Sequence, residues 1–118
     1  MAPCSRWLSA SGCLLAGAAI TLAAWAAHGP WDGGARAGLQ SAAWIALANG
    51  VGIAALAGRA STWAWRAALL AVASGTLLFA GSLLAARLTA GGAPLAPAGG
   101  LLMIGGWLLG AIAALRAR

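Results

Sequence analysis

The stretch AALLAVASGTLLFAGSLLAA, residues 67–86, contains no charged side chain and is long enough to cross a lipid bilayer as a helix. A helix needs about 20 mostly apolar residues to span the hydrocarbon core. Three other apolar stretches of similar length lie at 7–27, 39–57 and 99–115. Because lipid offers the backbone no hydrogen-bond partner, each of the four stretches is predicted to be a helix.

The composition of the whole chain agrees with this prediction. Hydrophobic residues make up 63% of the 118 residues and charged residues only 7%, whereas a soluble domain carries about 25% charged residues. The connections between the stretches are too short to fold separately. We therefore predict an all-α integral membrane protein, in which a single domain (1–118) forms a bundle of four transmembrane helices in up-down-up-down order. The first apolar run is longer than the 7–15 residues, roughly, of a signal-peptide core, so it is expected to be a retained helix.

Basic residues are distributed unevenly between the two predicted ends of the bundle. One end receives five arginines, namely Arg6, Arg59, Arg66, Arg116 and Arg118. The other end receives Arg36, Arg87 and the only acid, Asp32. Cytoplasmic loops carry the excess of positive charge, so both termini are predicted to be cytoplasmic, in a cytoplasmic (inner) membrane. The arginines are expected to contact membrane lipids at anionic headgroups. No segment offers the folded basic face that binding to nucleic acid requires.

Several residues mark the expected helix ends. His28-Gly29-Pro30 predicts the end of the first helix, with Gly29 in the left-handed position after it. Gly33 and Gly34 are expected to keep the first connection irregular, with Asp32 and Arg36 as an exposed pair within it. Ser61 or Thr62 is expected to cap the third helix. Five tryptophans fall near the predicted membrane interfaces, namely Trp7, Trp25, Trp31, Trp63 and Trp65.

A set of short motifs resembles a known family, the domain of unknown function 423 family, which includes the animal transmembrane protein 256 group. The matching positions run in order along most of the chain: Ala27-His28-Gly29, Gln40, Phe79-Ala80-Gly81-Ser82-Leu83, Pro97-Ala98-Gly99-Gly100 and Gly105-Gly106-Trp107. The chain departs from the family pattern at Leu39 and Leu84, where the family has tyrosine, and at Trp44, near which the family has a histidine. The resemblance implies a four-helix membrane protein and no particular reaction.

Few side chains are candidates for chemistry. His28 is the only histidine, and as a lone residue it is expected to bind carbonyl groups at a helix end rather than haem or a metal. No cofactor or metal is therefore expected. Asn49 is expected at mid-membrane, with Gly50 and Gly52 behind it. Sparse polarity is added to the spans by Gln40, Ser74, Thr76 and Ser82, which predicts hydrogen bonds between helices more than a solute path.

The fourth span contains the pattern GWLLG, residues 106–110, in which two glycines share one helix face. Small residues at this spacing let helices approach closely, and we expect this face to bind another membrane protein or a second copy, with Trp107 packed between helices. The candidate structural or interaction positions are His28, Gln40, Asn49, Gly81, Ser82, Pro97, Gly99, Gly100, Gly106, Trp107 and Gly110.

Three functional classes remain open on the sequence alone. The first is a structural or accessory protein, for example a small subunit of a larger membrane complex. The second is a small solute transporter or channel, although coupled transport usually needs an ionisable residue within a span. The third is a membrane enzyme or haem-binding subunit. It is the least expected, because a positioned base and a nucleophile are both missing from the spans.

Overall fold

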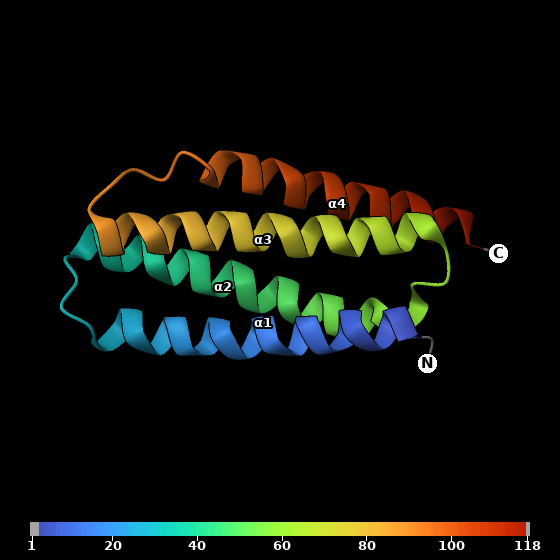
Figure 1. Ribbon diagram of the computed structural model, residues 1–118, viewed down its shortest axis with the longest axis horizontal. Coiled ribbons are helices and arrows are strands. Elements are labelled where there is room, and N and C mark those ends of the chain that lie inside the picture. Colours follow the sequence, from blue (N-terminus) through green and yellow to red (C-terminus); the bar gives the residue numbers. More distant parts are fainter. Residues whose placement is uncertain (1–2, 118) are drawn as a thin grey trace.

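The computed structural model describes residues 3–117, and within that range the chain forms four long helices and one short one (Figure 1). They are α1 (Pro3–His28), α2 (Gly33–Leu56), η1 (Ala57–Arg59), α3 (Trp63–Thr89) and α4 (Ala96–Arg116). The prediction of an all-helical fold is confirmed. The four long helices have the length and apolar composition that crossing a membrane requires.

The second helix is longer than predicted, because it begins at Gly33 rather than Leu39. Asp32 caps it: a carboxylate oxygen of Asp32 accepts a hydrogen bond of 2.7 Å from the backbone nitrogen of Ala35. Gly33 and Gly34 are therefore helical, and the expected irregular connection is wrong at these positions. Arg36 turns back toward the preceding loop, where its Nη2 lies 3.4 Å from the carbonyl oxygens of Gly29 and Trp31.

The other helix ends follow the expected residues with two changes. Thr62 caps α3 by accepting a hydrogen bond of 3.3 Å from the nitrogen of Trp65. No glycine in the described residues has a positive φ, so Gly29 is not left-handed. Its N–H instead bonds to the carbonyl of Trp25 at 2.8 Å, and the Trp31 ring occupies the place where a Cβ would stand. The left-handed residue is Ala90, which ends α3 with φ 54°.

Neighbouring helices alternate in direction and form two tight hairpins. Helix α1 packs along α2, α3 packs along α4, and α2 joins the two hairpins by packing on α3. No Cα atom of α4 comes within 8 Å of one in α1 or α2 in the described part of the chain. The bundle, about 50 Å long, is therefore open between α1 and α4 (Figure 1).

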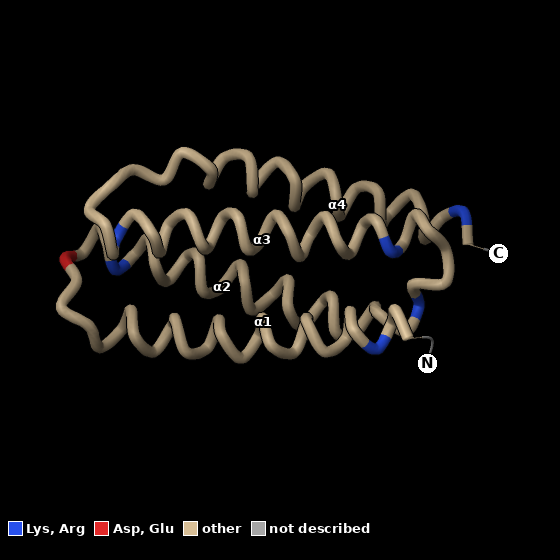
Figure 2. Tube along the Cα trace, in the orientation of Figure 1, with Lys and Arg blue, Asp and Glu red and all other residues tan. Residues whose placement is uncertain are grey.

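Charges gather at the two ends of this elongated bundle (Figure 2). The N-terminal end of α1, the connection from α2 to α3 and the end of α4 meet at one end, which carries Arg6, Arg59, Arg66 and Arg116. The opposite end carries Asp32, Arg36 and Arg87. Arg118 lies outside the described residues. The charge asymmetry predicted from the sequence thus corresponds to two physical ends of the molecule.

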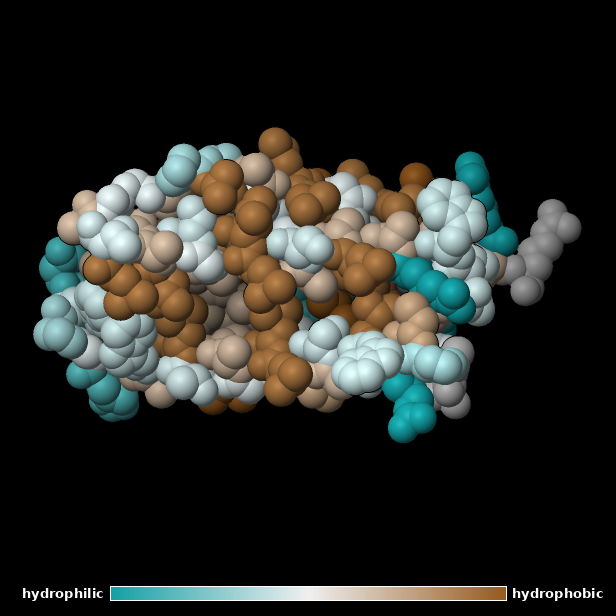
Figure 3. Space-filling view, in the orientation of Figure 1, coloured by the Kyte–Doolittle hydropathy of each residue, from teal (hydrophilic) through white to brown (hydrophobic). Residues whose placement is uncertain are grey.

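The surface between the two charged ends is apolar (Figure 3). Large aliphatic side chains point outward over much of it, among them Leu101 and Leu77 at 71% and 63% exposure. A soluble protein would bury such residues, whereas lipid is as apolar as they are. Trp7 and Trp63 are exposed near the arginine-rich end, but Trp65, expected at the interface, turns inward and is buried.

Candidate functional site

The most organised polar group in the described residues lies in the interior, where side chains of α2, α3 and α4 meet. Asn49 of α2 is buried, Thr76 of α3 is fully buried, and Met103 of α4 is buried beside them. Trp107 of α4 is partly exposed and reaches the same point with its indole nitrogen. We call these four residues the Asn49 cluster.

The hydrogen bonds of the Asn49 cluster pair its polar side chains with one another and with the backbone of α3. Asn49 Nδ2 donates to Thr76 Oγ1 at 2.8 Å and lies 3.0 Å from the sulfur of Met103. Trp107 Nε1 donates to Asn49 Oδ1 at 3.0 Å. The hydroxyl of Thr76 donates to the carbonyl of Val72, one turn earlier in α3, at 2.7 Å. A buried amide that is paired at both its oxygen and its nitrogen avoids the desolvation penalty of an unpaired group.

Trp107 spans a gap that the helix backbones leave open. Helix α4 touches α3 but not the backbone of α2 in the described residues, so only a long side chain can connect α4 to Asn49. Gly52 makes room for it, because a Cβ on Gly52 would lie 2.9 Å from Trp107 Cη2. Asn49 and Gly52 are three residues apart and therefore share a face of α2.

The chemistry available to the Asn49 cluster is that of neutral donors and acceptors. None of its side chains exchanges a proton near neutral pH, and the arrangement fixes the positions of three helices relative to one another. The sequence predicted Asn49 as a point of contact between helices, and the structure places it there. Trp107 was expected to be packed between helices; its indole nitrogen reaches Asn49 of α2, but its side chain is 37% exposed. The sequence reasoning missed Met103, and it noted Gly52 and Thr76 without assigning either of them a contact.

The fourth-span glycines occupy a different place from the one expected. Gly106 is buried against α3, since a Cβ there would lie 2.9 Å from both the carbonyl oxygen of Ala68 and the nitrogen of Val72. Gly110 is buried beside the ring of Trp65. The close packing that this motif predicts therefore occurs within the chain. The expectation that the Gly106–Gly110 face is free for a partner must be corrected, because α3 covers it.

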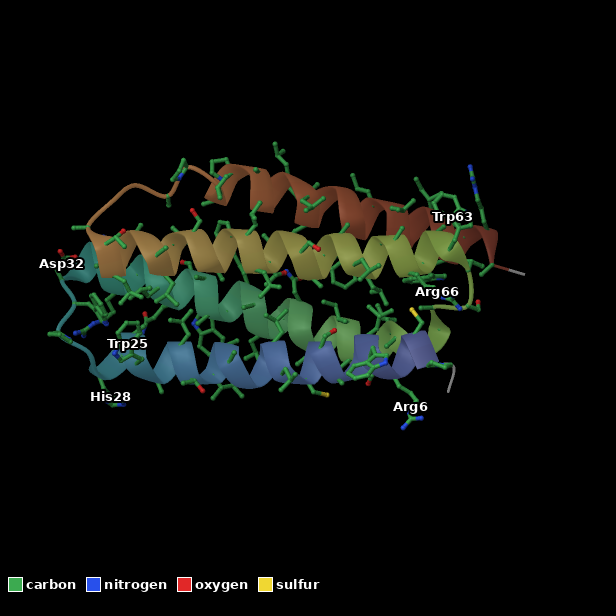
Figure 4. The ribbon with its side chains drawn as sticks, in the orientation of Figure 1. Arg6, Trp25, His28, Asp32, Trp63 and Arg66 are labelled. Carbon is green, nitrogen blue, oxygen red and sulfur yellow. The ribbon has the colours of Figure 1, made fainter. Side chains whose placement is uncertain are left out.

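The remaining candidate positions are dispersed and do not form one site. Gly99 is buried against α3, and His28 is exposed in the last turn of α1, where its side chain points away from the bundle (Figure 4). Gln40, Ser82 and Gly100 are half-buried, whereas Gly81 and Pro97 are exposed. Among residues 3–117 there is no group of three or more His, Cys, Asp or Glu that could hold a metal ion.

Comparisons with known proteins found no match for this chain among family models, curated proteins or solved structures.

Proposed function

We propose that this chain is a multi-pass protein of a cytoplasmic membrane, with both termini in the cytoplasm, that acts through helix–helix contacts as an accessory or structural component. Catalysis and coupled transport are not part of the proposal. Membership of the domain of unknown function 423 family is also a proposal, supported by the short motifs described above.

The observation that supports the proposal is that α4 packs on α3 through one face and leaves another apolar face exposed. Its inward residues recur every three or four positions and are buried on α3; they are Gly99, Met103, Gly106, Gly110 and Ala113. This spacing is that of helices that pack along a seam. A second stripe with similar spacing points outward and is exposed; it consists of Leu101, Ile104, Leu108, Ile112 and Leu115.

This outward stripe is a better contact surface than the glycine face that the sequence suggested. In the described chain α4 packs closely along α3 alone and reaches α2 only through the side chains of Met103 and Trp107. Much of its circumference is therefore available to another membrane helix. The backbone of Gly105 is also open there, because a Cβ on it would meet no atom within 4 Å. A partner helix could therefore approach α4 closely at mid-depth.

The Asn49 cluster supports the proposal from inside the bundle. Its polar groups are paired with one another, which favours a rigid unit that presents fixed outer faces. A coupled transporter usually has an ionisable residue within its path, and the only acid of the chain caps α2 at the end of the bundle.

Photo-crosslinking in native membranes tests the proposal. A photoreactive amino acid in place of Leu108, on the outward stripe, should give a discrete adduct with a protein. The same amino acid in place of Ile20, which is 58% exposed on α1, serves as the matched control. Adducts with lipid alone at both positions would contradict the accessory role.

A flux assay separates this proposal from the transport alternative. Purified protein in liposomes should move neither protons nor small solutes down a gradient. A flux that the wild type supports and Asn49→Leu abolishes would replace the accessory role with transport.

A further inference from the structure

A lateral groove lies between α1 and α3, which both pack on α2 but meet each other over only a short stretch. Two adjoining hollows of about 310 Å³ and 210 Å³ form it and share part of their lining. Ala46 of α2 lies at its floor. The walls are aliphatic or small side chains and include Leu15, Ala18 and Leu22 of α1 and Leu77, Gly81 and Leu84 of α3. We call this the α1–α3 groove.

The α1–α3 groove is short and lies near the mid-depth of the bundle, because Ser11 and Leu22 are 8 and 6 residues from the ends of α1. It extends along α1 from Ser11 to Leu22, which at 1.5 Å per residue is about 16 Å. That is about half of the ~30 Å hydrocarbon thickness. A partner helix would be expected to lie along the whole bundle, whereas an acyl chain that enters from one leaflet ends near the middle of the bilayer, where the groove lies.

The two ends of the groove differ. Three residues beyond Leu22 stands Trp25, whose ring meets the ring of Trp31 edge to face, with centroids 4.9 Å apart. Figure 4 shows Trp25 on the side of α1 that faces the other helices. At the opposite end, Trp7 lies one turn before Ser11 and is 78% exposed. A tryptophan thus stands beyond each end of the groove, and the two ends differ in charge, since the end near Trp7 carries most of the arginines.

Arg66 stands beyond the arginine-rich end of the groove, on the same face of α3. It precedes Ala73, a lining residue, by seven positions, which is two helical turns. Its Nε donates to the carbonyl of Ala60 at 3.0 Å. The two Nη groups make no hydrogen bond within the described residues, so four N–H donors remain for an anion. The N-terminus of α3, three residues earlier, adds positive potential.

We propose that the α1–α3 groove binds one anionic phospholipid from the leaflet at the arginine-rich end. One acyl chain lies in the groove, and the phosphate group lies at Arg66. Positive charge is greater at this end, which carries Arg6, Arg59, Arg66 and Arg116, whereas the other end carries Arg36, Arg87 and the only acid of the chain, Asp32 (Figure 2). The proposal is independent of any protein partner on α4.

Gly81 offers a way to fill the groove without disturbing the helices. A Cβ at this position would meet no atom within 4 Å, so Gly81→Leu places a side chain into the space of the acyl chain. Gly17→Leu is the matched control, since Gly17 of α1 is equally open and does not line the groove. Arg66→Gln removes the headgroup contact, and Arg59→Gln removes a charge from the same end without touching the groove.

The experiment measures retained lipid by native mass spectrometry of the full chain. The protein is offered equal amounts of phosphatidylglycerol and phosphatidylcholine that carry identical acyl chains. Wild type, Gly17→Leu and Arg59→Gln should retain phosphatidylglycerol preferentially. Gly81→Leu should retain little of either lipid, and Arg66→Gln should bind phosphatidylglycerol about fivefold more weakly, as expected for one arginine near a membrane surface.

Two results would overturn the proposal. Equal retention of both lipids by the wild type would show that Arg66 selects no anionic headgroup. A change of oligomeric state in Gly81→Leu, with lipid retention unchanged, would show that a second copy of the chain occupies the groove. Helical content measured by circular dichroism for each variant separates loss of lipid from loss of fold.

Discussion

Gly12 of α1 and Gly50 of α2 face each other so closely that neither has room for a side chain. A Cβ on Gly12 would lie 2.7 Å from the carbonyl oxygen of Gly50, and a Cβ on Gly50 would lie 2.8 Å from the carbonyl oxygen of Gly12. The obstructing atoms are backbone, so relieving the overlap requires the two helices to separate. The first hairpin therefore depends on these two glycines.

Gly50→Ala is expected to destabilise the protein by about 1–3 kcal/mol, the usual cost of overpacking. Gly17→Ala is the control, because that position is open and alanine favours a helix by up to about 1 kcal/mol over glycine. Reversible unfolding in detergent would measure both changes. Equal stability of the two variants would contradict the close contact between α1 and α2.

The second hairpin allows a comparison between adjacent residues. A Cβ on Gly99 would lie 2.6 Å from the nitrogen of Phe79 in α3, whereas a Cβ on Gly100 would meet nothing within 4 Å. Gly99→Ala should therefore lower the midpoint of thermal unfolding, and Gly100→Ala should leave it unchanged or raise it. The packing of α4 on α3 requires Gly99→Ala to unfold at a lower temperature than Gly100→Ala. The opposite result would contradict this packing.

The contact between Asn49 and Trp107 is suited to a double-mutant cycle. Trp107→Phe keeps most of the ring but removes the donor to Asn49 Oδ1, and Asn49→Leu removes the acceptor. Hydrogen bonds between helices in lipid contribute about 0.6 kcal/mol on average and up to about 1.7. The unfolding free energies of the single and double variants should give a coupling in this range. Strictly additive effects would mean that the two side chains do not interact.

Ala90 holds a left-handed conformation, with φ 54° and ψ 24°, that glycine adopts more readily. For a residue with a Cβ this conformation is unfavourable by roughly 1–2 kcal/mol. Ala90→Gly should therefore stabilise the protein by about 1 kcal/mol. Ala86→Gly, inside α3, should destabilise it by a similar amount. Thermal unfolding of the two variants should shift in opposite directions.

Single-cysteine labelling tests the membrane orientation. With Cys4 and Cys13 replaced by serine, a reagent that cannot cross the membrane should label Gly92→Cys from outside the cell. Ser61→Cys lies at the arginine-rich end and should react only after the membrane is permeabilised. The opposite pattern would place the arginine-rich end outside.

The four helices were predictable because an apolar run of about twenty residues can pair its backbone groups in lipid only by forming a helix. The residues at which each helix begins and ends were not predictable. Asp32 followed by two glycines is equally typical of a loop and of a helix cap, and only the bond to Ala35 decides between them. Similarly, the segment Gly91-Gly92-Ala93-Pro94 is typical of a break between helices, yet the left-handed residue is Ala90 rather than a glycine.

The site was less predictable, because its residues are far apart in the chain. Asn49 is 27 residues from Thr76 and 58 from Trp107, and only the relative register of three helices brings them together. The pair Gly106 and Gly110 correctly indicates a face that packs closely. A spacing on one helix does not identify the neighbouring helix, however, and this neighbour proved to be α3.

The pairing of Asn49 with residues of α3 and α4 has a consequence for biogenesis. The chain is made from its N-terminus, so α2 enters the membrane before Thr76, Met103 and Trp107 have been synthesised. Until then the amide of Asn49 lacks every partner it has in the folded protein. If synthesis is halted after α2, the hairpin of α1 and α2 should therefore insert incompletely into the membrane. Insertion of α2 should be completed only when α4 has been synthesised and inserted.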